Sequence, residues 1–186
     1  MNNQQNNTAR LAKMAMLVAI SIVLVMLIHF PIFPAVAFLE YDPADIPILI
    51  GTFAFGPAAG VVLTVVTAVL QGLTVSSSSG LYGIIMHIIA TGAYVLASSL
   101  FYKKHKTKKW AAVAIVIGTV TMVVCMFFAN LIITPYFMMG AVNSGTVSAV
   151  LSLMPFILLF NLIKAGVNGL ITFFIYKRVK HLFLKD

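Results

Sequence analysis

Apolar residues form long runs along almost the whole chain, and short polar segments separate the runs. Six runs are candidates for membrane-spanning helices, because a helix that crosses the hydrocarbon core needs about 20 mostly apolar residues. The runs cover residues 11–30, 46–55, 57–73, 81–102, 110–137 and 155–176. The second run is short for a full crossing. The pattern predicts an all-α membrane protein built as a bundle of six transmembrane helices.

Helix-breaking residues lie between the runs, where this scheme needs them. Two prolines follow the first run, and Gly56 and Pro57 separate the second run from the third. The tract SSSSG at 76–80 precedes the fourth run, and the segment 140–152 separates the last two. Glycine, proline and serine clusters of this kind favour turns and loops, so each boundary is expected to end a helix.

The composition agrees with a membrane protein. Of the 186 residues, 61% are hydrophobic and 9% are charged, whereas a soluble domain has about 25% charged residues. Apolar runs recur as far as Phe183, so a single amino-terminal signal peptide does not explain them. We expect residues 1–9 to form a disordered cytoplasmic tail and residues 10–186 to form one transmembrane domain.

The net charge of +8 comes from basic residues that gather at the ends of the apolar runs. The clusters lie at 10–13, 103–109 and 177–185. Lysine and arginine at the ends of spans mark the cytoplasmic side, so this placement sets membrane orientation and argues against nucleic acid binding. Six crossings put all three clusters, and both chain ends, in the cytoplasm of a bacterial plasma membrane.

A buried polar face is predicted on the last apolar run. Lys164 is the only charged side chain deep within a run, and Asn161 and Asn168 lie on the same helical face. Counting from the outer end of the run at about 1.5 Å per residue places Asn161 roughly 9 Å deep and Lys164 roughly 14 Å deep. A charged residue at this depth needs a partner; Asp45, Glu40 or carbonyl oxygens of a ligand are the candidates.

Three further polar residues lie at similar depth near the outer ends of other runs, namely Gln71, His87 and Asn130. Their clustering in one half of the membrane predicts a polar pocket that opens outward. The segment 31–45, which contains three of the four acidic residues, would cover it. Hydrogen bonding between helices is the alternative explanation for the asparagines.

Small residues form a stripe on the first run, with Ala12, Ala15 and Ala19 on one helical face. Such a stripe lets another helix approach closely. The second helix could belong to this chain or to a partner.

No catalytic motif is present. The chain has no GxxxxGK[ST] loop for nucleotide phosphates, no HExxH and no GxSxG. We therefore expect no enzyme activity and no cofactor, and uphill import would need an outside energy source.

Three stretches together resemble a known family: LEYDPADIPILIGTFAFGPAAG at 39–60, NLIITPYFMMG from Asn130, and PFILLFNLIKAGVNG at 155–169. They are similar to the substrate-binding S component of energy-coupling factor (ECF) vitamin transporters, most of all to its riboflavin-binding members. The resemblance covers nearly the whole chain.

The resemblance implies that riboflavin is the transported ligand. It implies that Asn130, Asn161 and Lys164 contact the flavin ring or the ribityl chain, while the first loop closes over them. With the residues chosen by depth, the candidate binding residues are Leu39, Glu40, Tyr41, Gln71, His87, Asn130, Asn161 and Lys164.

The resemblance also implies a partner. The family's AxxxA motif, here Ala15 to Ala19, docks onto a transmembrane coupling protein that carries two ATPase subunits. We therefore expect a high-affinity capture subunit of an ATP-driven vitamin importer.

Two alternatives remain open. His87 and the SSSSG tract depart from the family pattern, so the ligand could be another vitamin or a flavin nucleotide. The chain could also be a stand-alone carrier in which His87 and Lys164 relay protons. In the leading interpretation, Lys164→Ala should weaken ligand binding more than folding.

Overall fold

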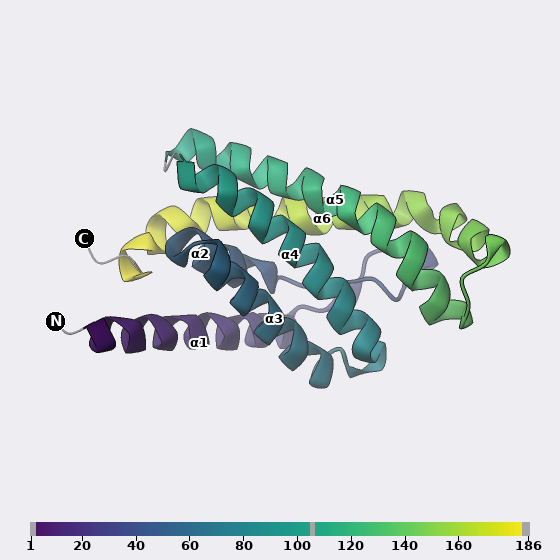
Figure 1. The fold of residues 1–186 in the computed structure, drawn as a ribbon, viewed down its shortest axis with the longest axis horizontal. Coiled ribbons are helices and arrows are strands. Elements are labelled where there is room, and N and C mark those ends of the chain that lie inside the picture. The colour runs from purple at the N-terminus through teal and green to yellow at the C-terminus, as the bar shows by residue number, and fades with distance from the viewer. Residues whose placement is uncertain (1–2, 105–106, 184–186) are drawn as a thin grey trace.

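The computed structural model describes residues 3–104 and 107–183, which form six α-helices and a few short elements. The helices are α1 (Asn3–Leu27), α2 (Asp45–Phe55), α3 (Pro57–Leu73), α4 (Gly80–Lys104), α5 (Lys108–Met139) and α6 (Ser144–Phe183). The short elements are the strands β1 (Phe30–Pro31) and β2 (Glu40–Tyr41) and the 3₁₀ turns η1 (Pro34–Val36) and η2 (Ser77–Ser79). Figure 1 shows the long helices running side by side.

Among the described residues, four helices are long and apolar enough to cross a membrane, namely α1, α4, α5 and α6. The shorter α2 and α3 have 11 and 17 residues. Large apolar side chains such as Phe128, Ile132 and Leu170 stay more than half exposed on the outside of the bundle. In a membrane this surface contacts lipid, so the chain forms an all-α membrane protein.

Two helices, α1 and α6, begin 8 and 11 residues earlier than the apolar runs indicated. Helix α1 begins at Asn3, within the segment 1–9 that was expected to be disordered, and residues 1–2 lie outside the described part. Once a helix has formed, each further residue adds a hydrogen bond at little cost, so the polar residues continue it. Helix α6 begins at Ser144 and continues through Pro155, because membrane helices tolerate proline where neighbouring groups satisfy the freed carbonyl.

Glycine ends two of the helices. Gly56 has φ 92° between α2 and α3, and Pro57 starts α3. Gly140 ends α5 with φ 71°, and its N–H donates to the carbonyl of Tyr136. Residues with a side chain rarely adopt these backbone angles, so the sequence breaks were placed correctly at both positions.

The first loop, residues 28–44, folds back over the bundle. Its strands pair antiparallel, with Phe30 opposite Tyr41. Val36 and Leu39 from this loop pack against Ile157 and Phe160 of α6 in a separate apolar cluster. The loop is therefore seated on the amino-terminal half of α6, and this positions its acidic residues.

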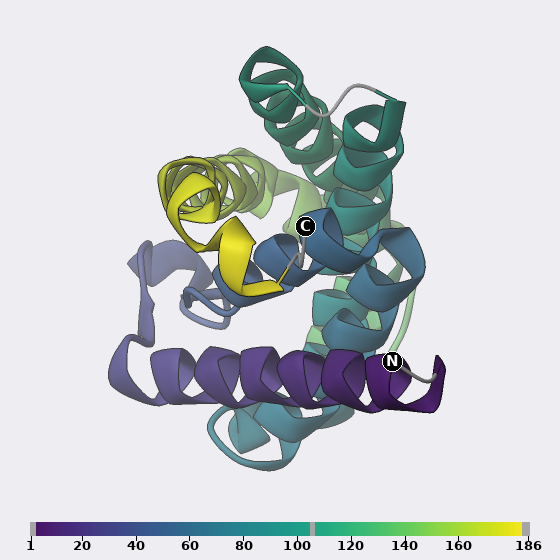
Figure 2. The same cartoon turned by 90° about the vertical axis from the view of Figure 1, so that its left-hand side faces the viewer.

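The two ends of the bundle differ in what they hold. Figure 1 shows both chain termini, the end of α4 and the start of α5 at one end of the bundle, which we call the basic end. The first loop and the α3–α4 and α5–α6 connections lie at the other end, which we call the loop end. Figure 2, seen from the basic end, shows α1 crossing in front of the other helices. Lys106 and Lys185, which belong to the predicted basic clusters, lie outside the described residues.

Candidate functional site

A partly open cavity of about 100 Å³ lies beneath the first loop. Helices α3, α4, α5 and α6 supply its walls, and the first loop closes one side. Its lining includes Leu39, Glu40, Gln71, His87, Asn161 and Lys164, six of the eight residues predicted to bind ligand. The structure therefore brings residues together that are up to 135 positions apart in sequence, from His29 to Lys164.

Lys164 is paired with a carboxylate from the first loop. Its Nζ donates to Oδ2 of Asp42 over 2.7 Å, and the side chains are only 10% and 3% exposed. Neither Glu40 nor Asp45, the two protein partners considered from sequence, makes this contact. The sequence alone does not identify which of Glu40, Asp42 and Asp45 pairs with Lys164, because the backbone conformation of this segment determines which carboxylate points at α6.

Asp42 is held by several other groups besides the ammonium. Gln71 Nε2 donates to the same carboxylate oxygen over 3.2 Å, and the Ala44 N–H donates to the other oxygen. Burial by itself would raise the pKa of Asp42, but the Lys164 charge, the nearby His87 and the hydrogen bonds from Lys164 and the Ala44 N–H outweigh burial and lower it to about 2. Asp42 is therefore ionised at neutral pH.

A second buried carboxylate, Asp45, lies at the start of α2 and is fully buried. Thr91 donates to one of its oxygens over 2.6 Å, and Asn168 Nδ2 donates to the other over 3.1 Å. Its position in the first turn of α2 also suits a negative charge, because the helix dipole is positive there. Asn168 donates to the Asp42 carbonyl as well, so α6 binds both ends of the short segment 42–45.

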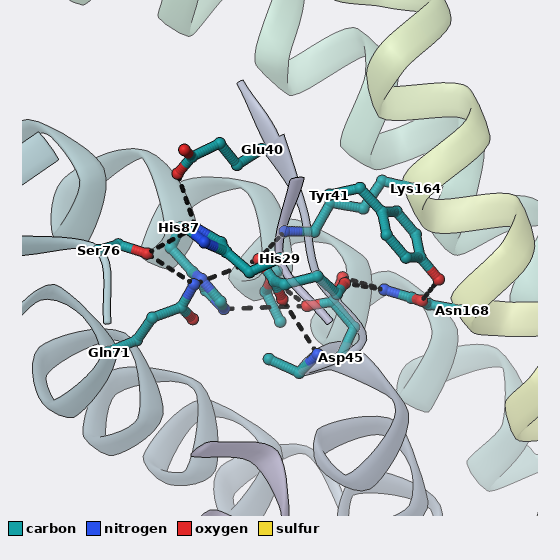
Figure 3. Close-up of polar contacts among 12 residues, drawn as sticks. His29, Glu40, Tyr41, Asp45, Gln71, Ser76, His87, Lys164 and Asn168 are labelled. Atoms are coloured by element: carbon teal, nitrogen blue, oxygen red, sulfur yellow. Dashed lines mark hydrogen bonds and ion pairs between the residues drawn. The ribbon is translucent and has the colours of Figure 1, made fainter. Parts of the chain in front are cut away.

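A chain of polar contacts runs from Asp42 to the edge of the loop. The Gln71 amide lies 3.4 Å from Ser76 Oγ, which lies 3.4 Å from His29 Nε2. His29 Nε2 in turn lies 2.6 Å from Glu40 Oε2, with both side chains about a quarter exposed. Figure 3 shows His29, Glu40, Gln71 and Ser76 close together, with His87 of α4 and Lys164 and Asn168 of α6 nearby. His29 is 11 positions before Glu40, and the antiparallel β1–β2 pairing brings the two together.

Two buried polar atoms in the cavity wall have no hydrogen-bond partner among the described residues. They are Gln71 Oε1 and His87 Nε2. His87 Nε2 lies 3.9 Å from an Asp45 oxygen, too far for a hydrogen bond. Unsatisfied buried polar groups are costly and uncommon. A bound solute with polar groups would satisfy both atoms.

The rest of the lining is apolar and adaptable. Met86, Met122 and Met126 line the cavity together with Phe160 and Tyr82. Methionine has three flexible side-chain bonds and packs well against aromatic rings. The combination of flexible thioethers, aromatic rings and few directed polar groups is typical of sites for flat organic molecules.

Two predicted binding residues do not line the cavity. Tyr41 points to α6, where its hydroxyl donates to Asn168 Oδ1 over 2.9 Å. Burial and then the nearby Asp42 charge raise the pKa of Tyr41, so its hydroxyl stays protonated. Asn130 is fully buried; its amide donates to the Met126 carbonyl and its oxygen accepts from Thr134. Asn130 supports a lining residue indirectly, because Thr134 also contacts the Tyr82 hydroxyl.

Several lining residues were missed from sequence. His29, Asp42, Ser76, Tyr82 and Thr91 all line the cavity. Ser76 belongs to the SSSSG tract, which the sequence flagged as unusual, and Asp42 lies within the acidic loop. Tyr82 and Thr91 gave no signal, because a tyrosine or threonine in an apolar run is compatible with any face of the helix.

The alanine stripe faces away from the chain's own core. Ala12, Ala15 and Ala19 are all exposed, whereas Leu17 and Val18 on the same helix are buried. The stripe therefore does not serve packing between helices of this chain.

The fold and the site define a class: a polytopic helical membrane protein with a partly open polar cavity beneath a loop at one end. Comparisons with known proteins give the family. Residues 9–176 match the family of the ECF transporter substrate-specific component. The chain therefore belongs to this family, a family of transporter substrate-binding components and not of enzymes, and it is a multi-pass protein of the cell membrane.

Two relatives that match along almost the whole chain support the same family assignment. The riboflavin transporter FmnP of Bacillus subtilis (strain 168) is 30% identical over 183 residues, which cover 92% of both chains. The riboflavin transporter RibU of Staphylococcus aureus (strain TCH60) is 30% identical over 191 residues, covering 100% of this chain and 96% of the relative. A solved structure of the S component of a bacterial ECF transporter is 28% identical, with a TM-score of 0.77 over 97% of this chain and 99% of that one.

Proposed function

We propose that this chain captures riboflavin at the outer face of the membrane, as the substrate-binding subunit of an ATP-driven ECF importer. The observation that carries the proposal is the cavity with two unsatisfied buried polar atoms, in a chain that matches riboflavin transporters along its full length. The isoalloxazine ring would pack among the methionines and aromatic rings. Its carbonyl and ring nitrogen groups would form hydrogen bonds with the two unsatisfied atoms, Gln71 Oε1 and His87 Nε2.

Six of the lining residues are proposed to contact the ligand: Leu39, Glu40, Gln71, His87, Asn161 and Lys164. Asn161 suits this role because its amide nitrogen is used within α6, in a bond to the Ile157 carbonyl, and its oxygen remains for a ligand donor. Tyr41 and Asn130 would act indirectly, by holding α6 and Tyr82 in place.

Ligand entry requires movement. The cavity of about 100 Å³ is smaller than the about 300–1,000 Å³ typical of small-molecule sites. The first loop and the methionine side chains are the parts that can move to enlarge the cavity. Residues 42–45 are fixed to α6 by the Lys164 and Asn168 contacts, so we expect the β1–β2 end of the loop to open.

The proposed orientation places all six helices across the membrane and both chain ends in the cytoplasm. It rests on the basic residues at one end of the bundle and the acidic loop at the other. The cavity then opens to the outside. The exposed alanine stripe on α1 fits docking to a transmembrane coupling protein with two ATPase subunits, since small residues let helices approach closely. This chain has no catalytic step of its own.

The test begins with the absorption spectrum of the purified full-length protein, because bound flavin is yellow. Titration of flavin-free protein with riboflavin should quench the flavin fluorescence at one site per chain. Flavin mononucleotide and thiamine serve as competitors: displacement of riboflavin by either at equal concentration would contradict riboflavin specificity. In vesicles, uptake should require the coupling protein and ATP, and uptake by this chain alone with an ion gradient would support the carrier alternative.

A further inference from the structure

A second, larger cavity lies at the basic end of the bundle. Its volume is about 310 Å³, within the range typical of small-molecule sites. The cavity lies between the last turns of α2 and α4, the first turns of α5 and the carboxyl-terminal part of α6. The lining residues are Phe53, Tyr102, Thr107, Lys108, Ala111, Ile115, Phe173, Phe174, Tyr176 and Lys177. It shares no residue with the cavity beneath the first loop.

The floor of this cavity is aromatic. Phe53, Tyr102 and Tyr176 form a cluster with ring centroids 4.8 to 6.1 Å apart. Phe174 lines the cavity and is 64% exposed on the outside of the bundle. The cavity therefore has an apolar wall that continues onto the lipid-facing surface.

The rim is cationic. Lys108 and Lys177 line the cavity from α5 and α6 and are exposed. Of the chain's four acidic residues, Glu40 and Asp42 belong to the first loop and Asp45 begins α2 directly after it, while the fourth, Asp186, lies outside the described residues. Within the described part, no carboxylate lies among the cavity's lining residues. The cavity is complementary to an anion.

We propose that this cavity binds the headgroup of an anionic phospholipid from the leaflet at the basic end. Such a lipid would place its phosphate between Lys108 and Lys177 and lay its acyl chain along Phe174. Basic pockets between membrane helices on the cytoplasmic side are the usual sites for acidic lipid headgroups. A free phosphate would use the lysines but would leave the aromatic floor in contact with water. An anionic phospholipid therefore complements both the cationic rim and the aromatic floor of the cavity.

The position along the membrane normal agrees with a lipid headgroup. Tyr102 and Tyr176 lie at the ends of their apolar runs, next to basic residues, and the chain's one tryptophan, Trp110, lies in the first turn of α5. Tyrosine and tryptophan are enriched at the level of the headgroups. The cavity thus opens where lipid phosphates are found.

The test measures lipid binding by the full-length protein with native mass spectrometry, using phosphatidylglycerol and phosphatidylcholine at equal concentration. We expect phosphatidylglycerol to be retained preferentially. Lys108→Gln/Lys177→Gln should lower its affinity by about 10- to 30-fold, since each basic residue near an anionic surface contributes on the order of 1 kcal/mol. The matched control, Lys109→Gln/Arg178→Gln, removes the same charge from adjacent positions that do not line the cavity, and should lower it by less than threefold.

Equal losses in the two double variants would overturn the proposal, because attraction would then depend on net charge and not on the cavity. Displacement of the lipid by millimolar inorganic phosphate would instead assign the site to a free anion. Ala111→Phe, which fills the cavity without changing charge, should also reduce phosphatidylglycerol retention. Riboflavin titration of every variant separates the two proposals, because the lipid variants should leave vitamin binding unchanged.

Discussion

The two ends of the bundle hold two cavities that differ in size and in chemistry. The cavity at the loop end is about 100 Å³ and contains a buried ion pair and two unsatisfied polar atoms. The cavity at the basic end is about 310 Å³, with an aromatic floor and a lysine rim. Size alone would assign the vitamin to the basic end. The chemistry assigns it to the loop end, because a specific solute site needs directed polar groups that water cannot reach.

The difference also shows how each end is stabilised. At the loop end, charges are buried and must be matched within the protein or by a ligand. At the basic end, the lysine side chains that line the cavity are exposed. Substitutions should therefore have larger effects at the loop end, and the predictions below run from the largest expected effect to the smallest.

Loss of the buried cation should destabilise the protein most. Lys164→Ala leaves the Asp42 carboxylate buried without its partner, which costs about 3–5 kcal/mol. Denaturant titration of the ligand-free protein in detergent micelles measures the loss. This changes the expectation from sequence alone, which was a larger effect on binding than on folding, because the pairing with Asp42 makes Lys164 structural as well.

The double variant Asp42→Asn/Lys164→Met separates the two roles. It removes both charges together, so more than half of the lost stability should return, while riboflavin affinity should stay low. Full recovery of affinity in the double variant would show that Lys164 acts only through folding.

Bulk on the alanine stripe should impair transport without affecting capture. Ala15→Trp projects from the exposed face of α1 and should lower ATP-dependent uptake on the order of 10-fold, because it prevents close helix approach. Ile20→Trp, also exposed on α1 but on a different face, is the matched control. Similar uptake by the two variants, measured in vesicles with the coupling protein, would place the docking surface elsewhere.

Loosening the edge of the first loop should speed ligand release. The His29–Glu40 pair is partly exposed, so its loss should cost about 0.2–1 kcal/mol, which is up to about fivefold in release rate. Stopped-flow fluorescence gives the release rates of His29→Gln, Glu40→Gln and the double variant. If the pair acts as a latch, the double variant should release riboflavin no faster than either single one; additive effects would mean that the two side chains act independently.

The smallest effect is expected from a hydroxyl that supports the loop. Tyr41→Phe removes the donor to Asn168 and should weaken riboflavin binding by about twofold, the lower end of the range for one neutral hydrogen bond, because Tyr41 does not line the cavity. Tyr102→Phe makes the same change in the basic-end cavity and should leave binding unaltered. Equilibrium fluorescence quenching compares the two, and a larger effect of Tyr102→Phe would contradict the separation of the sites.

The sequence predicted the parts of this structure that depend on hydropathy and depth. Helix positions followed from the apolar runs. Gln71, His87, Asn161 and Lys164 were identified because polar side chains are costly in hydrocarbon and therefore indicate a functional site. Asn130 was expected to line the cavity and does not, because an almost uniformly apolar helix does not reveal which way each of its faces points.

Loop geometry and helix ends could not be predicted in the same way. Lys164 pairs with Asp42 and not with Glu40 or Asp45. This pairing depends on the backbone conformation of the short segment that holds the three acids. The early start of α6 was missed because Pro155 was taken as a boundary, although the helix passes through it.

The most direct test of the account is to fill each cavity in turn and measure riboflavin binding. Ala90→Phe adds a benzyl-sized group to the loop-end cavity, and Ala111→Phe adds the same group to the basic-end cavity. With both variants monodisperse and helical, Ala90→Phe should abolish fluorescence quenching by the protein, while Ala111→Phe should bind riboflavin like the unmodified chain. Loss of binding in Ala111→Phe with full binding in Ala90→Phe would contradict the assignment of the vitamin to the cavity beneath the first loop.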